Sequence, residues 1–223
     1  LSEVIGKTGL DIKISGDLNT VAKKGDVIVD FTSPSSTVLN LAAAKKAKVP
    51  IVVGTTGLTD EEEGVAKSAS RFIPVLLSAN MSVGINLLFR IAPEIANLLG
   101  EDYNIEIIEA HHNKKKDSPS GTAKTLSRLI AEARGRLLEK VAVYGRKGKT
   151  GERDKKEIGI HAVRAGDIVG DHTVIYAGDN ERVEITHRAH SRDVFARGAL
   201  SAAAFLADKS PGLYSMQDVL KGV

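Results

Sequence analysis

Three short apolar runs constrain the fold of this chain more than any other feature of its sequence. Residues 27–31, 49–53 and 72–77 are apolar at nearly every position, which is typical of strands buried on both faces of a sheet. Helical segments separate the runs, one at residues 36–48 and one that begins at Thr59 with a capping box. Strands that alternate with helices predict a parallel α/β sheet, which binds ligands at the carboxyl ends of its strands.

The pattern changes after Asn80, which indicates a second domain. A helix at residues 82–99 and a strand at 105–109 lead to a helix at 122–133. A mostly antiparallel sheet is predicted next, because turns that contain Gly and Asp join four strand candidates, at residues 141–144, 158–164, 172–177 and 182–187. The last apolar helix, residues 194–206, is expected to pack back on the first domain.

Composition and charge exclude several classes of protein. The 31 Lys and Arg residues nearly balance the 28 Asp and Glu residues, so the net charge of +3 does not indicate a nucleic-acid-binding protein. A sequence without cysteine excludes disulfide scaffolds and thiolate nucleophiles, and it suits a reducing compartment. The longest apolar stretch, residues 83–99, is too polar to span a bilayer. We therefore expect a cytoplasmic protein that binds neither nucleic acid nor membranes.

The densest polar cluster, residues 109–123, lies between a predicted strand and a predicted helix. Ser120 suits the N-cap of that helix. The N–H groups of Gly121 and Thr122 would then lack partners at the positive end of the helix, where carboxylates and phosphates bind.

Basic side chains lie just before this helix. Lys115 and the pair His111 and His112 place an ammonium and an imidazole within a dozen residues of the helix start. Together they predict a pocket for an anionic substrate that also receives a proton. The alternative interpretation is a solvated basic loop followed by an ordinary N-cap.

Metal and phosphate sites receive little support. The histidines lack the HExxH spacing, and His111 and His112, as neighbours on a strand, point to opposite faces. Residues 6–8 and 148–150 resemble the end of a Walker motif but lack its first Gly, and no GxGxxG motif occurs. The basic, Gly-containing segment 145–151 is interpreted as a mobile hairpin loop at the surface.

Small polar residues follow each of the three buried strands. They occupy residues 31–33, 54–56 and 78–81. Backbone groups and small hydroxyls at the carboxyl edge of a parallel sheet can line a flat ring or a ribose. Strand-end Gly and Thr are also ordinary turn residues, so the prediction depends on their recurrence.

The polar cluster at residues 109–123 resembles the signature of the dihydrodipicolinate reductase family, bacterial and plant enzymes of lysine and diaminopimelate biosynthesis. The likeness covers nearly the whole chain, through residues 30–32, 54–57, 78–86, 163–170 and 184–188.

The resemblance implies a Rossmann-type dinucleotide-binding domain, interrupted by an α+β substrate and tetramerisation domain with a mixed sheet. The corresponding boundaries are residues 1–82 and 193–223 for the first domain and 83–192 for the second. The implied reaction is reduction of 4-hydroxy-tetrahydrodipicolinate (dihydrodipicolinate) to tetrahydrodipicolinate by NADPH or NADH, in a homotetramer and without a metal.

The resemblance also implies roles for individual residues. His111 and Lys115 match the positions that handle the proton, with Lys115 as the donor. His112, Gly121 and Thr122 match positions that bind the substrate. The cofactor-facing positions are Gly54, Thr55, Thr56, Ser78, Ala79, Asn80 and Met81. A further cation, Arg192, lies near the substrate side.

Two departures from the family pattern affect the cofactor. The Gly-rich phosphate loop is not found, and Ser33 stands where some members carry a basic residue, so the sequence does not indicate a preference between NADH and NADPH. We expect that the native chain carries roughly another 40–50 residues upstream, enough for a strand–helix–strand unit. Two alternatives stay open: a non-catalytic dicarboxylate-binding or oligomerising fragment, and a metal-dependent hydrolase.

Overall fold

The computed structural model describes residues 12–222, which form two compact units. Unit 1 contains the described residues up to Ser78 together with Ser201–Ser215. Unit 2 contains Ala79–Leu200 together with residues 216–222. Residues 79–82, 193–200 and 216–222 therefore group with unit 2, whereas the predicted boundaries place them in the first domain.

Unit 1 is built on a four-stranded parallel sheet. Its strands, in spatial order, are β1 (Ile28–Asp30), β2 (Ile51–Val53), β3 (Pro74–Leu77) and β9 (Gly212–Tyr214). All three side chains of β2 are buried, which explains why its apolar run shows no alternation, whereas Val29 of β1 is exposed, so the expected burial on both faces does not hold for β1. The three predicted strands and their parallel pairing are confirmed. Strand β9 escaped prediction because its residues, Gly-Leu-Tyr, do not form an apolar run.

Two helices connect these strands, and their starts follow from the sequence. Helix α2 (Pro34–Ala47) begins after Ser33, whose hydroxyl accepts the N–H of Ser36. Helix α3 (Asp60–Ala69) begins with the predicted capping box between Thr59 and Glu62. Two 3-10 turns precede β1, η1 (Leu18–Thr20) and η2 (Ala22–Lys24).

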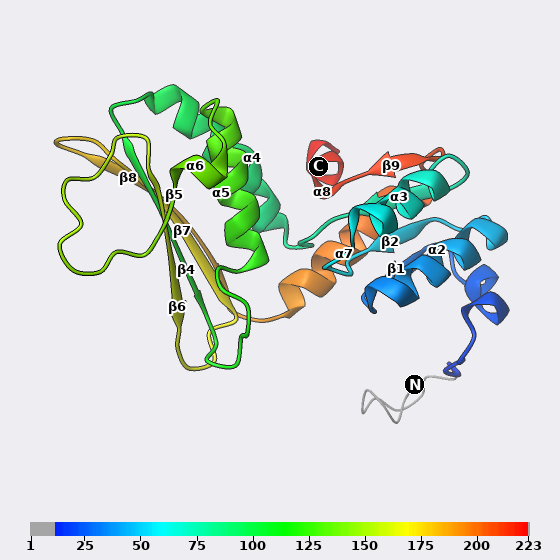
Figure 1. Ribbon diagram of the computed structural model, residues 1–223. Coiled ribbons are helices and arrows are strands. Elements are labelled where there is room, and N and C mark those ends of the chain that lie inside the picture. Colours follow the sequence, from blue (N-terminus) through cyan, green and yellow to red (C-terminus); the bar gives the residue numbers. More distant parts are fainter. Residues whose placement is uncertain (1–11, 223) are drawn as a thin grey trace. The chain divides into compact units, whose positions relative to one another are not determined.

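Unit 2 contains a five-stranded sheet with helices on one face. Its strands, in spatial order, are β5 (Ala142–Tyr144), β6 (Ile158–Arg164), β4 (Asn104–His111), β7 (Gly170–Ala177) and β8 (Arg182–Ala189). Helices α4 (Val83–Leu99) and α5 (Gly121–Ala133) lie against one face (Figure 1). The core between these two layers includes Ile107, Leu126, Val174 and Tyr176. We call the face that meets α4 and α5 the inner face and the opposite one the outer face.

The sheet of unit 2 is mixed rather than mostly antiparallel. Strand β4 pairs parallel with β6 and antiparallel with β7, and β6 pairs parallel with β5. Only β7 and β8 form the expected antiparallel hairpin. The expectation of a mostly antiparallel sheet was therefore wrong, whereas the mixed sheet implied by the family resemblance is confirmed.

The connection 145–157 is not a hairpin loop. It joins β5 to β6, which run parallel, so the chain must cross back along the sheet before β6 begins. Two of its basic residues, Arg146 and Arg153, donate to the carboxylate of Glu106 on β4. Figure 1 shows this connection on the side of the sheet away from α4 and α5. The prediction of a hairpin loop was wrong because β5 and β6 pair in parallel, and the sequence could not identify Glu106, about forty residues away, as the acidic partner of Arg146.

The last helices explain the division into units. Helix α7 (Asp193–Ala207) matches the predicted helix 194–206, and the boundary between the units falls within it. Helix α8 (Met216–Lys221) packs against α4, where the Gln217 amide donates to the Asn86 carbonyl at 2.9 Å. A short helix, α6 (Leu138–Val141), precedes β5.

The most apolar long helix, α4, continues through Pro93 and ends at Gly100. Across residues 12–222, no helix combines the length and the apolar character needed to cross a membrane.

Candidate functional site

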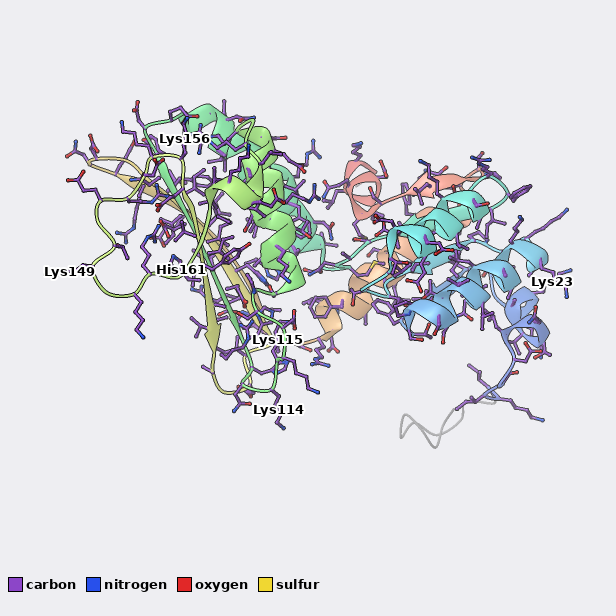
Figure 2. The ribbon with its side chains drawn as sticks, viewed as in Figure 1. Lys23, Lys114, Lys115, Lys149, Lys156 and His161 are labelled. Carbon is purple, nitrogen blue, oxygen red and sulfur yellow. The ribbon has the colours of Figure 1, made fainter. Side chains whose placement is uncertain are left out.

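The candidate site lies where β4 ends and α5 begins. Glu109 and His111 alternate along β4, so both project from the inner face, as do Arg164 on β6 and His172 on β7. The loop 112–120 then returns the chain to the N-terminus of α5. Figure 2 shows that Lys114 and Lys115 lie on this loop.

Glu109 is the centre of the site and has no exposed surface. Its carboxylate accepts two hydrogen bonds of 2.8 Å from the Arg164 guanidinium, one from His111 Nδ1 at 2.5 Å and one from the Ser120 N–H at 3.0 Å. Burial acts to raise the pKa of Glu109, but the hydrogen bonds from Arg164 and His111 lower it below its ordinary value. The carboxylate is therefore ionised at neutral pH.

His111 is held on several sides. Its ring meets that of His172 edge to face, with 5.2 Å between the centroids. A Cβ on Gly170 would come within 3.1 Å of His111 Nε2, so glycine gives the ring its space. Burial lowers the pKa of His111, and the charges of Lys115 and Arg164 add to this, so the pKa lies below its ordinary value although Glu109 acts to raise it.

His172 links the sheet to the start of α5. Its Nε2 lies 3.2 Å from the hydroxyl of Ser120, which is itself the N-cap that accepts the N–H of Ala123. Burial lowers the pKa of His172 to about 3, so the ring is neutral at pH 7.

The N-terminus of α5 keeps two free donors. Glu109 takes the N–H of Ser120, and the Ser120 hydroxyl takes that of Ala123. The N–H groups of Gly121 and Thr122 have no acceptor in the part of the chain that the structure describes. The Thr122 hydroxyl accepts a hydrogen bond of 3.0 Å from the Asn80 amide, which orients this residue. Two adjacent N–H groups at a positive helix end suit a carboxylate.

Lys115 lies in the loop 112–120, half-way along the sequence between Glu109 and the first residue of α5. Its ammonium is 2.8 Å from the Asp117 carboxylate, and its side chain is 20% exposed. The ion pair with Lys115 lowers the pKa of Asp117. Because Asp117 is more than half exposed, an anionic ligand can replace it at the ammonium.

A small cavity of about 260 Å³ adjoins the loop. His112 and Arg192 contribute cationic or polar groups to its wall, and Val169 contributes an apolar surface. The structure therefore brings Arg192, which sequence reasoning connected only loosely to the site, to the same cavity as His112.

The predicted cofactor residues lie in two places. Gly54, Thr55 and Thr56 follow β2 in unit 1, where the N–H of Thr32 donates to the Thr55 hydroxyl at 3.0 Å. A Cβ on Gly54 would lie 2.4 Å from the Phe31 ring, so a larger residue would have to displace this half-exposed ring. Thr56 is exposed at this edge.

A buried polar atom supports a ligand site at the same edge. Asp30 is 2% exposed, and its Oδ2 has no hydrogen-bond partner among the described residues. Its Oδ1 accepts from the Thr32 hydroxyl at 2.6 Å. An exposed hydroxyl, a glycine and an unsatisfied carboxylate oxygen fit the ribose and ring of a dinucleotide.

The predicted cofactor residues 78–81 differ in exposure and in their hydrogen bonds. Ser78 ends unit 1, and Ala79 is exposed. The Asn80 side chain bonds within unit 2, to Thr122 and to the N–H of Ser82. Met81 is 1% exposed, so both its side chain and its backbone are buried.

Sequence reasoning missed the partners of Glu109. Arg164 and His172 lie on other strands, and no local pattern identifies them. The usable signal was alternation, because Glu109 and His111 share a strand face. Among residues 12–222, no group of three or more His, Asp or Glu side chains is arranged to hold a metal ion.

Comparisons with known proteins agree with this geometry. Residues 1–81 match the family model "Dihydrodipicolinate reductase, N-terminus" and residues 84–220 match "Dihydrodipicolinate reductase, C-terminus". The chain is 51% identical over 217 residues to a 4-hydroxy-tetrahydrodipicolinate reductase of Geobacter sulfurreducens, covering 97% of this chain and 82% of the relative. It is 52% identical over 211 residues to the Syntrophotalea carbinolica protein of the same name, covering 95% and 79%.

A solved structure has the same fold. It is a dipicolinate-bound dihydrodipicolinate reductase from Paenisporosarcina sp. TG-14, with a TM-score of 0.70 and 23% identity. The similarity covers 96% of this chain and 82% of the other.

Proposed function

The chain belongs to the dihydrodipicolinate reductase family, and from that premise we propose which of its residues hold the substrate and deliver the proton. The family assignment makes it an oxidoreductase that reduces 4-hydroxy-tetrahydrodipicolinate with NADH or NADPH, in lysine and diaminopimelate biosynthesis. The observation that carries the residue assignment is the pair of free N–H groups at α5, beside Lys115 and His111.

One substrate carboxylate binds the N–H groups of Gly121 and Thr122. These groups need an acceptor, since both neighbouring N–H groups already have one within the protein. A carboxylate at this position also gains from the positive end of the α5 dipole, an effect of about 0.3–1 kcal/mol at exposed sites. His112 and Arg192 line the adjacent cavity and hold the second carboxylate of the substrate.

Lys115 donates the proton. The nicotinamide supplies hydride when it is bound, and the negative charge that this leaves on the substrate must be neutralised by a proton at a neighbouring atom. The Lys115 ammonium exchanges Asp117 for the dianion, which places an N–H donor beside the reacting atoms. His111 handles the proton at the same site, beside Lys115.

The cofactor binds along the carboxyl edge of the unit 1 sheet. Gly54, Thr55 and Thr56 offer backbone and hydroxyl groups there, and Asp30 offers a buried carboxylate oxygen. Residues 78–81, namely Ser78, Ala79, Asn80 and Met81, continue the cofactor-facing segment. The proposed site applies to NADPH and to NADH alike.

The outer face of the unit 2 sheet supports assembly into a homotetramer. Ile108 and Val163 are 37% and 44% exposed on this face, and α4 and α5 cover only the inner face. A second copy of the chain would bury these side chains. A native mass equal to one chain would contradict this. The cytoplasm is the location we propose, since a chain without cysteine suits a reducing compartment.

The test is a pair of variants in the same basic run. Lys115→Ala is expected to lower kcat by about 10²-fold or more, because it removes the proton donor. The dissociation constant for NADPH, measured by fluorescence titration, is expected to stay within about twofold. Lys116→Ala, an exposed neighbour, serves as the control and is expected to keep kcat within about threefold. Equal kcat values for the two variants would contradict the assignment of Lys115.

A further inference from the structure

The carboxylate of Glu109 is fully buried, and its donors belong to the candidate site. Four hydrogen bonds reach it, from Arg164, His111 and Ser120, on three different segments of the chain. We propose that Glu109 is a positioning residue with two effects. It fixes the tautomer of His111, and by accepting the Ser120 N–H it holds the start of α5 so that the N–H groups of Gly121 and Thr122 face the substrate site. This inference rests on the proposed roles of His111, Gly121 and Thr122.

The hydrogen bond between Glu109 and His111 determines where the imidazole proton lies. An ionised carboxylate has no proton to donate, so His111 Nδ1 must carry the hydrogen. In a neutral ring the other nitrogen, Nε2, is then an acceptor with a free lone pair. Nε2 lies over Gly170 and makes no hydrogen bond within residues 12–222. Glu109 thus presents the substrate site with one defined nitrogen of His111.

Glu109 is also the negative group that faces His111. Arg164 from β6, His172 from β7 and Lys115 from the loop are the other titratable groups around the ring, and each carries or can gain positive charge. Removal of the Glu109 charge would leave His111 among basic groups alone. The affinity of Nε2 for a proton would then fall.

Arg164 extends this arrangement to the loop that carries Lys115. Besides its two hydrogen bonds to Glu109, its guanidinium donates to the Asp117 carbonyl at 2.7 Å. The planar fork of arginine makes these bonds together, which a lysine ammonium would not reproduce. One buried ion pair therefore fixes His111, the N-cap of α5 and the loop of Lys115.

The chain offers a matched control for Glu109. Glu106 lies three residues earlier on β4, also pairs with arginine and histidine side chains, and faces the other side of the sheet. Glu109→Gln and Glu106→Gln therefore remove the same charge from the same strand, and only the first removes it from His111.

The test is ¹⁵N NMR of the histidine side chains in the full chain, with the His111 signals assigned from a His111→Asn variant. The wild-type protein is expected to show His111 with the proton on Nδ1. Glu109→Gln is expected to lose this signature and to titrate His111 at a lower pH than the wild type, because the charge that favours the imidazolium is gone. Glu106→Gln is expected to match the wild type. We also expect kcat to fall by about 10²-fold in Glu109→Gln, with NADPH affinity within about twofold.

Three outcomes decide the inference. A wild-type spectrum with the proton on Nε2 overturns it and needs no variant, so the test survives a Glu109→Gln protein that does not fold. An unchanged His111 tautomer in folded Glu109→Gln also overturns it. A lost Nδ1–H signature with unchanged kcat supports the positioning role of Glu109 and instead removes His111 from the proposed function.

Discussion

Two glutamates on one strand show how the faces of the unit 2 sheet differ. Glu106 and Glu109 each pair with arginine and with histidine, but they project to opposite faces of β4. The partners of Glu106 are Arg146 and Arg153 from the connection 145–157 and His161 from β6. Those of Glu109 belong to the candidate active site.

The two clusters differ in how deeply the carboxylate is buried and in which part of the structure it holds in place. The Glu106 side chain is 20% exposed, and its cluster fixes a long surface connection to the sheet. Burial opposes its ionisation, yet hydrogen bonds from Arg146, His161 and Arg153 bring the pKa of Glu106 to about 2. The Glu109 carboxylate is fully buried, so each partner it orders is held away from water. The same residue types therefore fix a loop on one face and a reactive histidine on the other.

The largest difference is expected when the arginines are removed. Arg164→Ala leaves the Glu109 charge buried without its main partner, which is expected to lower the free energy of unfolding by about 3 kcal/mol or more. Arg146→Ala removes a more exposed partner and leaves Arg153 in place, so the expected loss is below about 1 kcal/mol. Urea denaturation measures the free energy of unfolding of both variants. Losses of equal size would contradict the claim that the deeper burial of Glu109 makes its ion pair more important for stability.

Mild acid, between pH 6.5 and 4.5, is expected to act mainly on the inner face, because the lowered pKa of Glu106 makes the outer face respond only below about pH 4.5. Burial lowers the pKa of His111, His172 and His187 there, so in acid the unfolded chain binds protons that the folded chain does not. The free energy of unfolding should thus fall as the pH drops below about 6.5, and for His172 until about pH 3. His172→Gln is expected to reduce the fall between pH 6.5 and 4.5 by about 2 kcal/mol. Parallel curves for variant and wild type would contradict this.

A smaller effect is expected at the start of α5. Thr122→Val removes the hydroxyl that accepts from Asn80 but keeps the N–H, so the carboxylate site is displaced rather than lost. We expect the KM for the dicarboxylate substrate to rise about tenfold, with kcat nearly unchanged. Steady-state kinetics at saturating NADPH gives both constants, and an unchanged KM would show that the bond between Asn80 and the Thr122 hydroxyl does not orient the carboxylate site.

The smallest effect on activity is expected from Gly159 on the outer face. A Cβ at this residue would lie 1.7 Å from Glu106 Oε2, so Gly159→Ala must displace the carboxylate and loosen Arg146 and Arg153. Limited proteolysis should then cleave the connection 145–157 faster, while kcat stays within about threefold. Unchanged cleavage would show that the Glu106 cluster does not fix the connection.

Local patterns predicted much of this structure. The buried strands of unit 1, the capping box at Thr59 and the N-cap at Ser120 each depend on neighbouring residues, and the structure contains all three. The free N–H groups of Gly121 and Thr122 followed from the same N-cap argument.

Pairings between distant segments could not be predicted in the same way. Strand β9 joins β3 from more than a hundred residues away, and Arg164 meets Glu109 across 55 residues. The basic connection 145–157 suggested a mobile loop because its charges were visible and its partner Glu106 was not. Charge alone does not reveal whether an arginine meets water or a carboxylate.

The comparison of the two glutamates is tested most directly by one kinetic measurement. Single-turnover reduction of the substrate is followed by NADPH absorbance for Glu109→Gln and Glu106→Gln side by side at pH 7. We predict a rate about 10²-fold below wild type for Glu109→Gln and within about threefold of wild type for Glu106→Gln. Equal rates for the two variants would show that the inner-face cluster does not position the groups that deliver the proton.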